Sequence, residues 1–393
     1  MNASLVDRVR DRLIDSPEAT SLRASAVADA LRAEGVVLGA DELLPLVGAL
    51  HDEMRGLGPL QSLVRDASVT DVLVNASGDV WIDRGTGLER VPGLQVAGAE
   101  GIRLAQRLAA RAGRRLDEAT PFVDARMPEG ARLHAILPPV SSGGAVISLR
   151  IPRRASFTLD ELVRGGTLCV LGARWIDAIV RARLSFLITG ATGSGKTTIL
   201  GSILGLVPHD ERILIVEDSA ELRPDHPHVV SLEARPPNLE GAGHVTLRDL
   251  VRQALRMRPD RVVVGEVRGA EVVDLLAALN TGHEGGCGTV HANSPADLPA
   301  RLEALGLMAG LPRDAVHALA AAGLDVVLHV ARSREGRRVT GIHVVQPRGG
   351  FISTTPALVD DIEGMRPCTG FDELVDRIRA RGVVPPEGPG LGG

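Results

Sequence analysis

The chain has 393 residues, of which 44% are apolar, 24% charged and only 2% aromatic, and its formal net charge is −5. These values are typical of a folded protein of two or three domains and exclude a disordered chain. The acidic balance and the scarcity of aromatic rings argue against direct nucleic-acid binding, because phosphates attract basic surfaces and bases stack on rings.

Residues 1–49 predict a helical N-terminal extension, because VDRVRDRLID and DELLPLVGALHDEM place apolar residues at helical spacing. The first residues lack the apolar stretch of a signal peptide, and no run approaches the 18 apolar residues of a membrane span. We therefore expect a cytoplasmic protein whose contact with the cell membrane is peripheral.

Residues 50–151 predict a small α+β domain. Period-two patterns favour one hairpin that turns at residues 77–79 and a second that turns at 128–130, followed by a strand in GAVISLRIP. The segment AEGIRLAQRLAARAG has the spacing of a helix. Residues 152–166 then predict a linker.

Residues 167–380 predict an α/β domain. The buried strands LSFLITG, RILIVED and RVVVGE alternate with helical segments, which favours a mostly parallel sheet with helices on both faces. The strands VVLHVAR and GIHVVQP predict a later hairpin. The Pro/Gly-rich tail, residues 381–393, predicts disorder.

The turn after the first of these strands has the pattern G-x-x-x-x-G-K-[ST] and leads into a helix. Its backbone amides and the helix N-terminus are suited to holding phosphate oxygens. We expect the lysine to reach the β- and γ-phosphates of ATP and the following threonine hydroxyl to ligate Mg²⁺. The expected nucleotide-binding residues are Gly190, Ala191, Thr192, Gly193, Ser194, Gly195, Lys196, Thr197 and Thr198.

Lys196 is the single lysine among 44 basic residues; all the others are arginines. A compact ammonium and a planar guanidinium are not interchangeable against phosphate oxygens. The position of this lysine therefore indicates that nucleotide chemistry decides the residue there.

Two acidic motifs follow predicted strands. Glu217, Asp218 and Glu221 come after the second strand, and Glu266 comes after the third. Ligands of open parallel sheets bind at the carboxyl ends of the strands, so these acids are candidates to orient water and to associate with Mg²⁺. The alternatives are an acidic first turn of a helix and a solvated strand end.

The segment TGHEGGCGTVHAN carries His283, Cys287 and His291. A zinc site needs more ligands than two histidines around one cysteine, so a polar relay beside the nucleotide is the better interpretation. Cysteines occur only at positions 169, 287 and 368 without any C-x-x-C pair, which fits a reducing compartment. By themselves, Arg132 and Arg150 in the predicted N-terminal strands read as solvated residues.

The ordered set of P-loop, E-D-x-x-E, G-E-x-R and T-G-H-x-G-x-x-x-T-x-H-A-N resembles the type II/IV secretion-system ATPases. The upstream stretch GLGPLQSLVRDASVTDVLVN resembles the N-terminal domain of that family, and the branch it looks like is that of tight-adherence (Flp) pilus assembly ATPases of actinobacterial type. The resemblance covers about residues 50–350. It implies a homo-hexamer, a RecA-like ATPase domain, ATP with Mg²⁺ between the two domains, and an inner-membrane platform protein as partner.

The resemblance also implies roles for individual residues. Glu221 matches the general base, and Glu266 matches the acid of the magnesium and water site. Arg132 and Arg150 match N-terminal arginines that reach a phosphate across a domain or subunit boundary. His283 and His291 match the histidine box, and Arg268 matches a residue that bridges motifs.

Two alternatives to a pilus or secretion motor remain at this point. One is a P-loop motor that handles DNA, as in conjugal DNA transfer, which the acidic charge and missing aromatic residues disfavour. The other is a regulatory switch that binds ATP without sustained turnover, against which the acids and the arginine pair argue. Ser219 stands where the family often has proline, and the four-cysteine zinc module of many type II relatives is missing.

Overall fold

A computed structural model describes residues 24–33, 35–36, 39, 57–66, 68–85, 87–128, 130–151, 156–235, 237, 242–333, 336–361 and 364–387. The chain divides into two compact units, residues 1–153 and 154–393. The two helical stretches expected before residue 55 and the last six residues of the expected tail lie outside the described residues.

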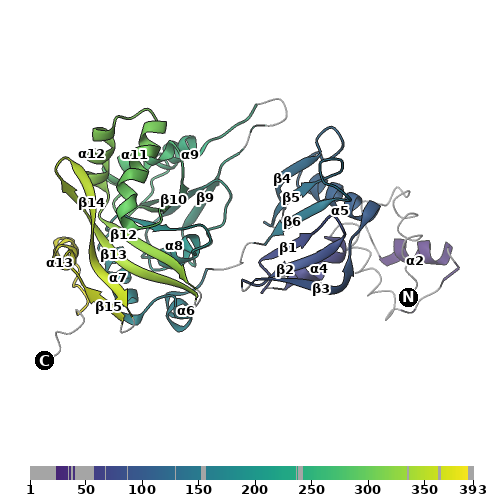
Figure 1. The fold of residues 1–393 in the computed structure, drawn as a ribbon, viewed down its shortest axis with the longest axis horizontal. Coiled ribbons are helices and arrows are strands. Elements are labelled where there is room, and N and C mark those ends of the chain that lie inside the picture. The colour runs from purple at the N-terminus through teal and green to yellow at the C-terminus, as the bar shows by residue number, and fades with distance from the viewer. Residues whose placement is uncertain are drawn as a thin grey trace. The chain divides into compact units, whose positions relative to one another are not determined.

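The first unit contains a six-stranded antiparallel sheet in the order β3-β2-β1-β6-β5-β4 (Figure 1). Both expected hairpins are present, and the helix α5 packs its apolar stripe into the core of this unit through Leu104 and Leu108. The elements are α2 (Ala24–Ala33), η1 (Gly58–Leu60), α4 (Gln61–Arg65), β1 (Asp71–Val74), β2 (Asp79–Asp83), β3 (Leu88–Gln95), α5 (Gly98–Arg111), β4 (Phe122–Arg126), β5 (Arg132–Ile136) and β6 (Val146–Arg150).

The second unit contains a nine-stranded sheet in the order β15-β14-β13-β12-β7-β11-β10-β8-β9. The strands from β9 to β12 in this order run parallel, and β13 to β15 extend the sheet antiparallel. The strands are β7 (Phe186–Gly190), β8 (Ile213–Glu217), β9 (Val229–Glu233), β10 (Arg261–Val267), β11 (Cys287–His291), β12 (Val326–Ser333), β13 (Gly336–Arg348), β14 (Phe351–Asp361) and β15 (Gly364–Pro367).

Helices cover both faces of this sheet, as the alternating pattern predicts (Figure 1). Along β7, Ile188 faces the core formed with α7, α8 and α13, and Leu187 faces the core formed with α9 to α12. The helices are α6 (Leu159–Arg164), α7 (Val170–Arg181), α8 (Lys196–Leu204), α9 (Leu247–Ala254), α10 (Glu271–Leu279), η2 (Pro295–Asp297), α11 (Leu298–Met308), α12 (Arg313–Gly323) and α13 (Phe371–Ala380).

Most of the expected linker, residues 152–166, belongs to the second unit. Residues 159–164 form α6, which begins with a reciprocal capping box between Thr158 and Glu161 and buries Leu162 in the core of the second unit. The capping residues and the apolar position were visible in the sequence, but a six-residue helix is too short for its periodicity to be decisive. Among the described residues, no helix is long and apolar enough to cross a bilayer.

A buried arginine fixes the amino-terminal edge of the second sheet. Arg261, at the start of β10, is 1% exposed, and its Nε lies 2.6 Å from Glu211 Oε2. Its Nη groups donate to the carbonyls of Val180 and Gly285. These bonds join segments that are far apart in the chain, and they satisfy a charge that would be costly to bury alone.

We expect Arg261→Leu to destabilise the second unit by about 3–5 kcal/mol, because it leaves the nearly buried Glu211 carboxylate without this partner. The matched control is Arg181→Leu on α7, whose ion pair with Asp177 is 65% exposed on the arginine side and should contribute at most about 0.5 kcal/mol. Chemical unfolding of both variants measures the difference, and equal midpoints would contradict the assigned role.

Candidate nucleotide site

The carboxyl ends of the parallel strands meet at one edge of the second sheet. β7 ends at Gly190 and is paired there with His291 at the end of β11. On the other side of β11, β10 ends at Val267, next to β8, which ends at Glu217. The register therefore brings the P-loop, the histidine motif and both acidic motifs to the same edge, which is where open α/β sheets bind ligands.

The P-loop connects β7 to α8 with backbone that only glycine adopts readily. Gly193 has φ +71° and Gly195 has φ +97°, and Gly195 is the N-cap of α8. This geometry leaves the first amides of α8 without intrahelical partners at the positive end of the helix dipole. The loop is therefore a ready-made anion site.

Lys196 is 6% exposed, and its ammonium donates to the carbonyls of Gly190 and Ala191, at 2.9 Å each. Burial lowers the pKa of this lysine, and the nearby Glu266 carboxylate partly opposes the shift. The Ser194 Oγ, also buried, finds no hydrogen-bond partner among the described residues. A nearly buried cation beside an unsatisfied hydroxyl fits the phosphate groups of a nucleotide.

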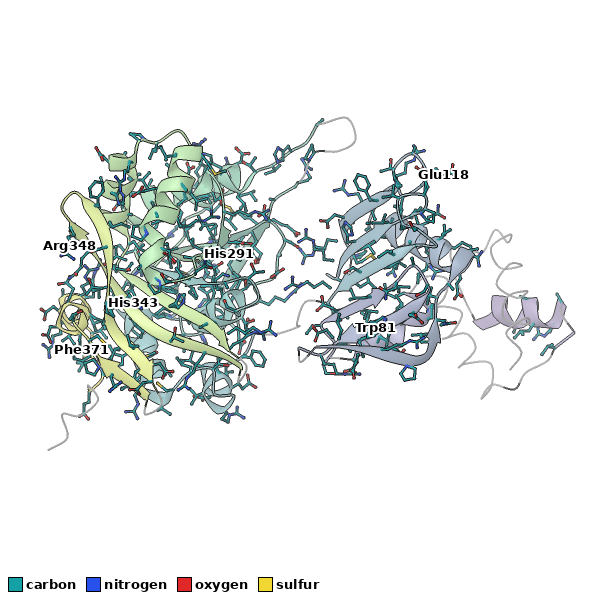
Figure 2. The ribbon with its side chains drawn as sticks, viewed as in Figure 1. Trp81, Glu118, His291, His343, Arg348 and Phe371 are labelled. Atoms are coloured by element: carbon teal, nitrogen blue, oxygen red, sulfur yellow. The ribbon has the colours of Figure 1, made fainter. Side chains whose placement is uncertain are left out.

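A polar chain runs from the acid of β10 to the P-loop. Glu266 Oε1 lies 2.7 Å from His291 Nε2, and His291 Nδ1 lies 3.4 Å from Thr192 Oγ1. His291, labelled in Figure 2, stands at the end of β11, and with Thr192, Asn293 and Arg301 it lines a pocket of about 630 Å³. The chain and the pocket place an acid and a histidine beside the phosphate loop.

The acids that follow β8 have different environments. Glu217 is 4% exposed, and its Oε1 accepts hydrogen bonds from the backbone amides of Glu221 and Leu222, at 3.1 Å each. Glu221 itself is exposed. Asp218 forms an ion pair with Arg268 at 2.5 Å, which connects this acidic motif to the one at the end of β10.

The sequence profile of the type II/IV secretion system proteins matches residues 53–350. The chain belongs to this family. A protein of Mycobacterium tuberculosis strain H37Rv with a provisional name as a conjugal transfer protein is 55% identical over 309 residues, which cover 77% of this chain and 88% of the relative. The conjugal transfer protein TrbB of Rhizobium radiobacter is 32% identical over 74% of this chain and 88% of its own length.

A solved structure gives the same fold. The ATPase DotB of Legionella pneumophila aligns with a TM-score of 0.51 at 20% identity and covers 77% of this chain and 80% of DotB. The expected type II/IV secretion-system ATPase family and the expected two-domain α/β fold are thus confirmed.

The two histidines of the motif do not share a site. His291 stands at the carboxyl end of β11, but His283 precedes the amino end, where Gly285 contacts Ser185 and Arg261. The strand between them is roughly 15 Å long at about 3.3 Å per residue. A relay through both histidines, as the sequence suggested, is therefore corrected to one that runs through His291.

The two candidate arginines of the N-terminal unit, Arg132 and Arg150, lie side by side. Arg132 on β5 is directly opposite Arg150 on β6, and both are exposed. Arg132 also forms a two-pronged ion pair with Asp124, at 3.0 and 2.7 Å. Arg126 on β4 occupies the next place in the same cross-strand row. Sequence reasoning missed Arg126, because only the register of three strands places it there.

A second feature that sequence reasoning missed is the contact between the hairpin of β12 and β13 and the P-loop. Arg337 Nε donates to the Gly193 carbonyl at 3.1 Å. Earlier on β12, His329 Nδ1 lies 2.9 Å from Thr189 Oγ1 of β7, and burial lowers the pKa of His329. The sequence predicted the hairpin but held no signal for its overlap with the loop.

Glu217 gives a pH-dependent prediction. Burial raises its pKa to about 7, from an ordinary value of 4.5, although the hydrogen bonds that it accepts from two backbone amides oppose the shift. The folded state therefore holds the proton more tightly than the unfolded state. Stability from this group is present below pH 4.5 and is lost as the pH rises through 7, by roughly 3 kcal/mol.

We expect Glu217→Gln to remove this loss, so that the variant gains stability relative to the parent chain at pH 8 but not at pH 4. Chemical unfolding at several pH values measures the effect. Glu118→Gln is the control, since Glu118 is exposed and belongs to the first unit. A constant difference between Glu217→Gln and the parent across this range would contradict the assignment.

Proposed function

We propose that this secretion ATPase is a hexameric motor that hydrolyses ATP to assemble a Flp or tight-adherence-type pilus, or to secrete a protein, through an inner-membrane platform protein. The proposal rests on the nearly buried Lys196 ammonium at the P-loop and on Glu266, whose carboxylate lies 2.7 Å from His291 beside the same loop. The motor would work at the inner face of the cell membrane through its partner.

The residues of the loop divide the work on the nucleotide. Lys196 and the first amides of α8 would bind the phosphates, and Thr197 and Glu266 would hold Mg²⁺. The magnesium ion would neutralise charge on the phosphate oxygens. Family membership and the matched motifs support this division, and the Glu266–His291–Thr192 chain supports a fixed orientation of the acid relative to the loop.

Glu221 is our candidate for the general base. Its backbone amide is fixed by Glu217, while its own side chain is exposed at the edge of the sheet. Glu217 is engaged by two amides and nearly buried, so it is less able to meet an attacking water. We infer that Glu217 shapes the loop and that Glu221 removes the proton from water.

Arg132 and Arg150 are our candidates for the arginines that act in the transition state. They stand directly opposite each other, which brings two positive charges together on one face of the sheet, although Arg132 also pairs with Asp124. We propose that they reach the phosphates across a domain or subunit boundary of the ring. Arginines supplied in this way accelerate hydrolysis by roughly 10³–10⁵.

Conjugal DNA transfer is the second candidate, because the two curated relatives described above carry conjugal transfer names. The net charge of −5 and the 2% of aromatic residues favour a protein partner over DNA as the direct contact. ATPase assays with and without single- and double-stranded DNA distinguish the two, since several-fold stimulation by DNA would favour the second candidate.

Lys196→Ala should abolish ATP hydrolysis and leave the thermal unfolding of the protein unchanged or slightly raised. Lys196→Arg should also be inactive, because a guanidinium does not fit where two carbonyls hold a compact ammonium. A phosphate-release assay checks both variants. Normal turnover in Lys196→Ala would overturn the proposed function.

Arg150→Ala should lower kcat by about 100-fold or more while the affinity for ATP changes by less than about threefold, because the contact forms mainly in the transition state. The control is Arg90→Ala on β3, an exposed residue that pairs with Asp79. Steady-state kinetics and nucleotide titration separate the two effects. An equal loss of turnover and affinity would contradict the role in the transition state.

A further inference from the structure

The hairpin of β12 and β13 projects past the end of the P-loop strand. His329 on β12 is paired with Thr189, the residue before the end of β7, and β12 continues for four more residues to Ser333. Because β12 runs parallel to β7, the extra length extends over the edge where the phosphate loop lies. Any side chain on the loop-facing side of this overhang is placed beside the nucleotide site.

Two arginines occupy that side. Arg332 on β12 is directly opposite Arg337 on β13, so both side chains belong to one face of the hairpin. Arg337 donates to the Gly193 carbonyl at 3.1 Å, and its Cδ would lie 3.0 Å from a Cβ added at Gly195. Arg332 Nη1 would lie 3.7 Å from a Cβ added at Gly193. Because Gly193 and Gly195 have no Cβ, both arginine side chains can approach the loop closely.

The neighbouring arginine is a natural contrast. Arg338 follows Arg337 directly and therefore points to the other face of the hairpin. There it forms an ion pair with Asp360 of β14. The hairpin thus directs Arg338 toward Asp360 and the other two arginines toward the phosphate loop.

The hairpin arginines and Lys196 place three positive charges at the phosphate loop. Like charges directly opposite each other on adjacent strands destabilise a sheet, and here the pair stands beside a third cation, Lys196. A doubly or triply charged phosphate chain in the loop would offset this repulsion and offer acceptors to the forked guanidinium groups.

We propose that Arg332 and Arg337 are phosphate-binding residues of the same chain, which hold the nucleotide from the β12 side while Glu266 and His291 flank it from the β11 side. This inference rests on the proposed ATP site. It differs from the roles of Arg132 and Arg150 because the hairpin arginines belong to the unit that carries the P-loop, so they would act on binding of ADP and ATP alike.

The test is the affinity of the full chain for labelled ADP and ATP with Mg²⁺. Arg332→Ala and Arg337→Gln should each weaken both affinities about tenfold, as expected for one charge-assisted hydrogen bond. Arg337→Lys should retain affinity to within about threefold because it keeps the positive charge. Arg338→Ala is the matched control and should bind like the parent chain.

The glutamine variant separates two roles of Arg337. A glutamine side chain can still donate to the Gly193 carbonyl, so a purely structural bond would leave Arg337→Gln close to the parent chain in affinity. That result, or unchanged binding by Arg332→Ala and Arg337→Gln together, would overturn the inference while the proposed function stands. Loss of binding in Arg338→Ala equal to that in Arg337→Gln would also overturn it. No ADP binding by the parent chain would overturn the proposed function itself.

Discussion

The site depends on one nearly buried ammonium. Lys196 is withdrawn from water at the start of α8 and is held by two neutral carbonyls of its own loop. Neutral oxygens compensate only part of the cost of removing a charge from water. The loop therefore favours a bound anion, and the acids and arginines lie around this position.

The parallel register of the sheet brings motifs that are distant in the sequence to one edge. β7, β11, β10 and β8 are neighbours in that order, although their order in the chain is β7, β8, β10, β11. This arrangement puts His291 next to the P-loop and places the acids of β10 and β8 further along. The same register sends the start of β11, with His283, to the opposite edge, where Arg261 binds neighbouring carbonyls.

The two sides of the phosphate loop differ in chemistry. The β11 side carries a carboxylate and a histidine in contact, which can orient a metal ion or water. The β12 side carries the arginine pair of the hairpin, which can only donate hydrogen bonds and positive charge. In the proposed ATP site, this division would let one side serve bond cleavage and the other serve binding, so that mutations could affect the two functions separately.

The sequence by itself determined the P-loop, the strand–helix alternation, the hairpins and the family. These features are local, since a few adjacent residues fix a glycine-rich turn or a buried strand, and the motifs occur in order along the chain. Only the tertiary structure decided that α6 belongs to the second unit, that His283 and His291 lie at opposite edges, and that Arg337 contacts Gly193. The first depends on the packing of Leu162 into the core of the second unit, and the other two depend on the pairing of strands far apart in the chain. Side-chain period and turn signals do not encode which strands become neighbours or how far one extends past another.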